Sequence, residues 1–93
     1  MVDSGKPYSD THISENSFIR VFDDDIDPIE LLWHRDKEDR TVVVLHDTDW
    51  QYQEDNKLPI ELKEGISIFI PRHSWHRLIN GTNKLKLSIV ETG

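Results

Sequence analysis

The chain has 93 residues, a length that allows one domain and excludes a second. Eighteen acidic residues against eleven basic ones give a formal net charge of −7, which repels phosphate backbones and anionic lipids. Nucleic acids and membrane surfaces are therefore not expected as partners. Cysteine is absent, so the chain has neither a disulfide framework nor a thiolate metal site.

The first fifteen residues are polar and contain no long apolar run, so they predict neither a signal peptide nor a membrane span. Their Ser, Asp, Gly and Pro content is typical of a tail, which we expect to be disordered unless a partner chain or a sheet edge orders it. We therefore divide the chain into a polar N-terminal tail, residues 1–15, and one domain, residues 16–93. A cytoplasmic location is expected.

The composition favours β-structure, since alanine is absent and isoleucine, valine and threonine together number 21. Turns rich in Asp, Asn, Gly and Pro separate eight apolar stretches, each of which predicts a short strand. Short strands at this spacing are typical of a sandwich or barrel, so we expect an all-β fold. The predicted strands are 18–22, 29–34, 40–46, 50–53, 58–62, 66–70, 75–80 and 85–90.

Residues 65–80 carry the clearest pattern in the chain. Gly65 ends a turn, an apolar strand follows, Pro71 stops it, and a tight loop returns the chain to His76 early on the next strand. The string resembles the second motif of the cupin superfamily, G-x5-P-x-G-x2-H-x3-N, at every spacing up to Asn80. His73 stands where the family usually has glycine, and the other fixed positions match.

An upstream stretch, residues 33–47, resembles the first cupin motif, G-x5-H-x-H-x3,4-E-x6-G. His34 stands at the first histidine, Asp36 at the second, Arg40 at the glutamate and Asp47 at the closing glycine. The two motifs and the strands between them cover half of the chain. The resemblance implies an all-β, single-domain cupin jelly-roll barrel, which is also called a double-stranded β-helix.

The resemblance implies a metal site at His34, Asp36 and His76. Side chains two apart on a strand face the same way, so His34 and Asp36 can share a face, and barrel closure would bring His76 to them. Two imidazoles and one carboxylate can hold a divalent ion such as iron, manganese, nickel or zinc. The set is also similar to the His-x-Asp…His triad of non-haem iron, 2-oxoglutarate-dependent oxygenases. The alternative is that Asp36 caps backbone amides in its turn and needs no metal.

A permanent cation at Arg40 would repel a nearby divalent ion. Either Arg40 points into the barrel and pairs with Glu30 or an anionic ligand, or it turns away and leaves the three protein ligands in place. We assign Arg40 and Glu30 as candidate substrate-binding residues, with a Glu30–Arg40 ion pair as the hypothesis. Two exposed rim charges are the alternative.

The remaining histidines and the tryptophans are assigned by their positions in the predicted strands. His46 is expected in a turn, with a role as an extra ligand or proton carrier as the alternative, and His12 and His73 are expected to be solvated. Alternation turns Trp33 and Trp75 away from the site, although core packing is the stronger expectation for every tryptophan. On the strand that Trp50 opens, the face carrying the glutamines is expected to line the cavity.

No Ser-His-Asp or Cys-His nucleophile arrangement and no glycine-rich phosphate loop can be assembled from the sequence. The leading hypothesis is a small metal-binding cupin that acts on a small polar organic molecule inside the barrel, by a dioxygenase-, isomerase- or lyase-like reaction. The alternative is a metal-free binding or sensing module for a carboxylated or hydroxylated ligand. A third is an assembly element, and a homodimer is compatible with all of them.

Overall fold

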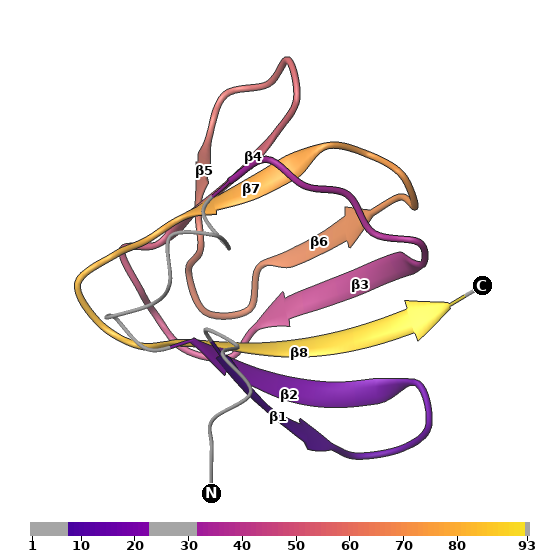
Figure 1. Cartoon of the computed structure of the whole chain (residues 1–93). Coiled ribbons are helices and arrows are strands. Elements are labelled where there is room, and N and C mark those ends of the chain that lie inside the picture. The colour runs from indigo at the N-terminus through magenta and orange to yellow at the C-terminus, as the bar shows by residue number, and fades with distance from the viewer. Residues whose placement is uncertain (1–7, 23–31, 93) are drawn as a thin grey trace, which may run out of the picture.

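The computed structural model describes residues 8–22 and 32–92 (Figure 1), and within these ranges the chain forms β-strands and no helix. The prediction of an all-β chain is confirmed. Among these residues there is accordingly no helical segment that could cross a membrane. The strands are β1 (Tyr8–His12), β2 (Ser17–Phe22), β3 (Asp39–Val44), β4 (Gln51–Glu54), β5 (Ile60–Glu61), β6 (Ser67–Ile70), β7 (His76–Ile79) and β8 (Leu85–Thr92).

The strands form two antiparallel sheets (Figure 1). The larger sheet has the order β1-β2-β8-β3-β6 and the smaller has the order β5-β4-β7. Because β8 pairs with both β2 and β3, the end of the chain lies in the middle of the larger sheet and joins its two halves. Chain segments that are far apart in sequence therefore become neighbours.

The core lies between the sheets and follows from the alternation of side chains along each strand. In β2, Phe18, Arg20 and Phe22 point inward and are buried, while the residues between them are only half-buried. The same alternation holds for β8, where Leu85, Leu87 and Ile89 are buried. The side chains with the least exposure are those of Trp50, Leu62, Leu85 and Val44.

The N-terminal segment forms the edge of the larger sheet. Tyr8–His12 pairs with β2 over its full length, so Tyr8 lies opposite Phe22 and His12 opposite Phe18. The expectation of a disordered tail is therefore wrong for these residues, and a sheet edge orders them, which was the stated alternative. Residues 1–7 lie outside the described residues, and the boundary at residue 16 stays a prediction.

Half of the predicted strand 29–34, residues 29–31, lies outside the described residues. Of its described part, Leu32 is exposed and only His34 pairs, in an isolated bridge to His76. The other predicted strands each overlap a strand of the structure, although β5 is reduced to Ile60–Glu61. The apolar runs therefore located these strands but did not give their lengths.

A polar clamp joins the start of β4 to the turn between β7 and β8. The carboxylate of Asp49 accepts hydrogen bonds from the Thr82 amide at 2.8 Å and from the Thr82 hydroxyl at 2.7 Å. Gly81 allows this approach, because a Cβ at that position would collide with the Asp49 carboxylate and with the ring of Trp50. The hydrogen bonds from Thr82 hold the pKa of the Asp49 carboxyl below its ordinary 3.8.

We predict that Asp49→Asn lowers stability at pH 6 and that the difference from wild type disappears as the pH falls. A carboxyl whose pKa is lower in the folded than in the unfolded state stabilises the fold above the unfolded value, and this contribution is lost as the pH drops through the folded value. Urea unfolding at pH 6 and at pH 2.5 measures the effect. A difference that persists unchanged at pH 2.5 would contradict it.

Candidate metal centre

His34 and His76 are held side by side by their own backbones. The His34 amide donates to the His76 carbonyl at 2.9 Å, and the His76 amide donates to the His34 carbonyl at 2.9 Å. Residues paired directly opposite each other in this way present their side chains on the same face. The ring centroids lie 4.5 Å apart, with the rings inclined at 64°. Two positions separated by more than forty residues thus become one pair of imidazoles.

Both imidazoles are oriented by backbone carbonyls two residues before them. Nδ1 of His34 lies 3.0 Å from the Leu32 carbonyl oxygen, and Nδ1 of His76 lies 3.0 Å from the Ser74 carbonyl oxygen. A carbonyl only accepts, so each Nδ1 carries the proton and each Nε2 of the neutral ring presents its lone pair. This is the tautomer that a metal ligand needs, and the carbonyl partner fixes the ring orientation.

Asp36 reaches the same point from the loop between His34 and β3. Its carbonyl accepts a hydrogen bond of 2.8 Å from the His73 amide, which ties this loop to the one before β7. His73 has φ of 65°, in the left-handed region that glycine adopts most easily, at the position where the cupin motif has glycine. The turn cap predicted for Asp36 is made by Asp39, whose Oδ1 accepts a 2.7 Å hydrogen bond from the Arg72 amide.

The candidate ligand atoms of His34, Asp36 and His76 all lie within 4.8 Å of one another. His76 Nε2 is 3.2 Å from Asp36 Oδ2, a buried oxygen that accepts no hydrogen bond. In the neutral ring with its proton on Nδ1, these two atoms are both acceptors, and facing acceptors repel unless a second proton or a metal ion lies between them. Two ligands about 2.1 Å from one ion are about 3.0 to 3.4 Å apart at cis or tetrahedral angles, so this pair fits.

The electrostatics of Asp36 favour its charged form. Burial raises the pKa of this carboxyl, but the contact with His76 in its protonated form, the charge of Arg40 and the charges of protonated His76 and His34 outweigh burial and lower its pKa overall. A carboxylate at neutral pH is what a divalent ion requires. The orphaned oxygen and the two oriented imidazoles therefore fit a metal ion.

Arg40 lies beside this group and does not turn away. Its Nε donates to Glu91 Oε2 at 2.9 Å, its Nη2 lies 2.7 Å from the same oxygen, and its Nη1 lies 3.4 Å from Asp36 Oδ2. Glu91 faces Arg40 directly across the β3–β8 pairing. The predicted ion partner Glu30 lies outside the described residues, so a Glu30–Arg40 pair stays a hypothesis.

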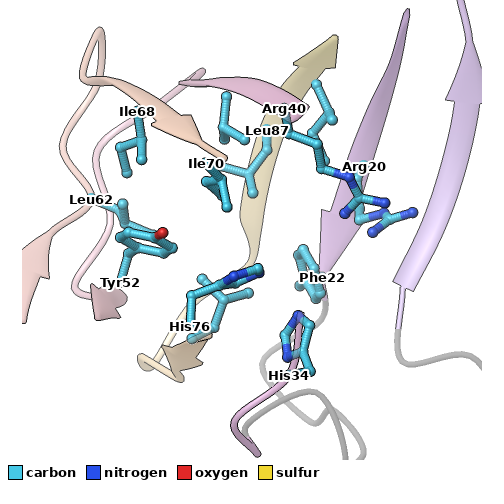
Figure 2. Close-up of a pocket in the computed structure, with 13 residues that line it drawn as sticks. Arg20, Phe22, His34, Arg40, Tyr52, Leu62, Ile68, Ile70, His76 and Leu87 are labelled. Atoms are coloured by element: carbon cyan, nitrogen blue, oxygen red, sulfur yellow. The ribbon is translucent and has the colours of Figure 1, made fainter. Parts of the chain in front are cut away.

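A cavity of about 50 Å³ lies between the sheets next to these side chains (Figure 2). His34, His76, Arg40 and Arg20 line it and are labelled in Figure 2. The remaining wall is mostly aliphatic, from β3, β6, β7 and β8. This volume holds a few water molecules, or an ion with one small ligand.

Arg20 was not among the predicted site residues, although it lines the cavity. Its Nε and Nη2 donate to the two carboxylate oxygens of Asp10 at 2.8 and 2.9 Å, and its guanidinium lies 3.6 Å from the ring centroid of Tyr8. Both partners belong to β1. The sequence signal is a charged residue between Phe18 and Phe22 on the inward face of a strand, where an aliphatic residue would be expected.

Tyr52 is a second residue that was not predicted. Its ring lies in the cavity wall 5.8 Å from that of His76, and its hydroxyl faces Glu54 at 3.4 Å. Burial, with the charge of Glu54, raises the pKa of this phenol, so it stays protonated. The expectation that the glutamines of β4 line the cavity is wrong. Gln53 instead accepts from Arg77 and donates to the Lys57 carbonyl outside the cavity.

The other histidines and tryptophans lie away from the metal group. His46 sits in a bend with Nδ1 near the Asp47 carbonyl, and it is not part of the group of candidate ligands in the described residues. His73 is exposed. Of the tryptophans, Trp50 is buried as expected, whereas Trp33 and Trp75 are 40 % and 45 % exposed. Core packing was the wrong expectation for those two, and the outward direction from alternation is confirmed.

Comparison with known proteins identifies the fold. No family model and no curated protein matches the sequence. A cupin domain from Bordetella pertussis tohama I is 18 % identical over 100 % of this chain and 99 % of that one, with a TM-score of 0.63. The DMSP lyase structures RdDddP and RnDddQII give 16 % identity and a TM-score of 0.70 over 83 % of this chain. An iron(II) HppE in complex with its substrate gives 18 % identity and a TM-score of 0.66 over 91 % of this chain.

The chain therefore has the jelly-roll fold of the cupins, as the two motifs indicated. It spans 37 % of the DMSP lyase chain and 52 % of the HppE chain, so it matches only part of those enzymes. The B. pertussis domain, by contrast, is matched along nearly its whole length. The likeness establishes the arrangement of strands, and the chemistry has to be argued from the residues of this chain.

We predict that Asp10→Asn lowers the free energy of unfolding by about 1 to 3 kcal/mol, because the buried Arg20 guanidinium loses its charged bidentate partner. Urea unfolding at pH 7 measures the change. Ser9→Ala, on the exposed face of the same strand, is the control and should stay within about 0.5 kcal/mol of wild type. Equal effects of the two substitutions would show that β1 does not anchor Arg20.

Proposed function

We propose that this protein is a small metal-dependent cupin in which His34, Asp36 and His76 hold one divalent ion, and that it acts on a small polar organic molecule. The observation that supports this proposal most directly is that His76 Nε2 lies 3.2 Å from Asp36 Oδ2, a buried oxygen that accepts no hydrogen bond. Iron, manganese, nickel and zinc are the candidate ions. The iron(II) form of the HppE that shares this fold supports the choice of iron among them.

When bound, such an ion supplies a Lewis acid and open coordination positions for a substrate oxygen. The protein's own residues do the remaining work. The Leu32 and Ser74 carbonyls keep the two imidazoles in the ligating tautomer, and the aliphatic wall limits access of water to the centre. Arg40 places a guanidinium next to the reacting position, where it can orient a polar substrate group.

Tyr52 forms part of the wall of the same cavity, but its hydroxyl proton is directed to Glu54, so its oxygen can only accept from a ligand. Arg40 supplies the donor for a small polar ligand besides the ion. Dioxygenase-, isomerase- and lyase-like reactions all remain compatible with this arrangement, and the DMSP lyases of the same fold make a lyase a concrete candidate to assay.

Metal content is the first test. We expect elemental analysis of wild-type protein, loaded with each candidate ion and then desalted, to give about one ion per chain, and His76→Ala to retain less than a tenth of it. His46→Ala is the matched control, because it removes an imidazole outside the ligand group and should retain the wild-type content.

The metal-free binding module is the alternative function. It is favoured by Arg40, which already gives Asp36 a positively charged neighbour 3.4 Å away. Wild-type protein that retains no ion from any of the four metals would support this alternative. Calorimetric titration of the same metal-free protein with small carboxylates and polyols would then identify the ligand class.

The pH dependence of metal retention gives an independent check of histidine ligation. Imidazole binds a metal only when it is neutral, so we expect the bound ion to be lost as the pH falls below about 6. Dialysis of loaded protein at pH 7.5, 6.5, 5.5 and 5.0, followed by elemental analysis, measures the loss. Full occupancy at pH 5.0 would contradict ligation by His34 and His76.

Two further parts of the proposal concern assembly and location. We propose a homodimer, supported by the exposed indoles of Trp33 and Trp75, which lie on the outer side of the smaller sheet against Arg77 and Arg35 respectively. A cytoplasmic location is part of the same proposal. Light scattering of the purified protein and fractionation of the source cells decide the two points.

A further inference from the structure

We propose that the centre takes up its metal together with a small carboxylate, and that Arg40 couples the two binding events. The inference rests on the proposed metal site and adds the class of ligand that completes it. Its starting point is the way in which Arg40 is held, because the guanidinium is fixed along one edge and presents the other edge to the centre.

Glu91 contacts only one edge of the Arg40 guanidinium, the edge that carries Nε and Nη2. Nε donates to Glu91 Oε2 at 2.9 Å, Nη2 lies 2.7 Å from the same oxygen, and the side chain of Arg40 is only 16 % exposed. Nη1 is left on the side of the metal group, 3.4 Å from Asp36 Oδ2. This oxygen accepts no hydrogen bond, so Nη1 has a charged neighbour there but makes no hydrogen bond to it.

With a divalent ion bound, the charged groups around the centre sum to one net positive charge, which one anion would balance. A divalent ion on two neutral imidazoles and the Asp36 carboxylate keeps one net positive charge. Arg40 adds a second, and Glu91 balances only one of them. Glu38 lies 4.0 Å from Arg40 Nη2 with its side chain 40 % exposed, so solvent screens it, and Arg20 is matched by Asp10. A positive charge in a cavity lined mainly by aliphatic groups is unfavourable unless an anion accompanies it.

The size and lining of the cavity identify the anion as a small carboxylate. Three protein ligands leave open positions on the ion, and the cavity of about 50 Å³ adjoins them. One carboxylate oxygen can occupy an open position while the other accepts from Nη1 of Arg40, and the short apolar remainder lies against Val42 and Ile70. Arg40 would then repel the ion when it binds alone and stabilise it when the anion is present.

Coupling of this kind is reciprocal and can be measured without any activity assay. Calorimetric titration of metal-free wild-type protein with Zn²⁺ and with Mn²⁺, in a buffer free of carboxylates, gives the Kd for each ion alone. Adding formate, the smallest carboxylate, should lower that Kd by about tenfold, within the range of typical coupling energies. The metal should tighten formate binding by the same factor, and this comparison needs no variant.

Arg40→Gln removes the coupling residue. We expect it to bind the metal alone more tightly than wild type, because a nearby positive charge is gone, and to change its Kd less than twofold on adding formate. Arg40→Lys keeps the charge without the fork, so its metal affinity should stay near wild type while the formate effect falls. Arg77→Gln is the control, since it loses the same charge from the outer face beside Trp33 and should keep the wild-type response.

A formate effect of equal size in wild type and Arg40→Gln would overturn the role of Arg40. Metal binding that formate leaves unchanged in wild-type protein would overturn the joint uptake itself while leaving the metal site standing. Wild-type protein that binds neither ion, with or without formate, would instead contradict the proposed metal function, so the two failures are distinguishable. Circular dichroism of each variant shows that the comparison is made between folded proteins.

Discussion

The rest of the site depends on the two backbone hydrogen bonds that join His34 to His76. They bring together the two histidines of separate sequence motifs and put both rings on one face. Because both hydrogen bonds join main-chain groups, the pairing does not depend on the protonation or the ligands of the two imidazoles. The orientation of each ring is also set by the main chain, through the carbonyls of Leu32 and Ser74. The imidazoles are therefore arranged before any ligand arrives.

Much of the fold was predictable because its signals are local. Alternation of side chains located most strands, and the spacing from Gly65 to Asn80 indicated the jelly roll. The strand at Tyr8–His12 was missed, since it has few large apolar residues and depends on pairing with β2, a contact that the local sequence does not encode. Tertiary pairing thus outweighed a composition that is typical of a tail.

The proximity of the three candidate ligands could be predicted from the sequence, whereas the residues that surround them could not. The positions of His34, Asp36 and His76 follow from motif spacing, and the structure places them together. Glu91 could not be foreseen, because it meets Arg40 across the pairing of β3 with β8, fifty-one positions along the chain. The faces of β4 were assigned the wrong way round, since the glutamines looked like the polar lining and the cavity wall proved to be mostly apolar.

Asp10 and Arg20 give the beginning of the chain a part in the interior of the barrel. The carboxylate on β1 fixes a guanidinium that forms part of the cavity wall, and Tyr8 stacks over the same group. A substitution in β1 at Asp10 or Tyr8 therefore acts on the wall of the cavity as well as on the edge of the larger sheet. Sequence variation in β1 thus reaches the lining of the cavity through Arg20 and leaves the candidate ligating side chains untouched.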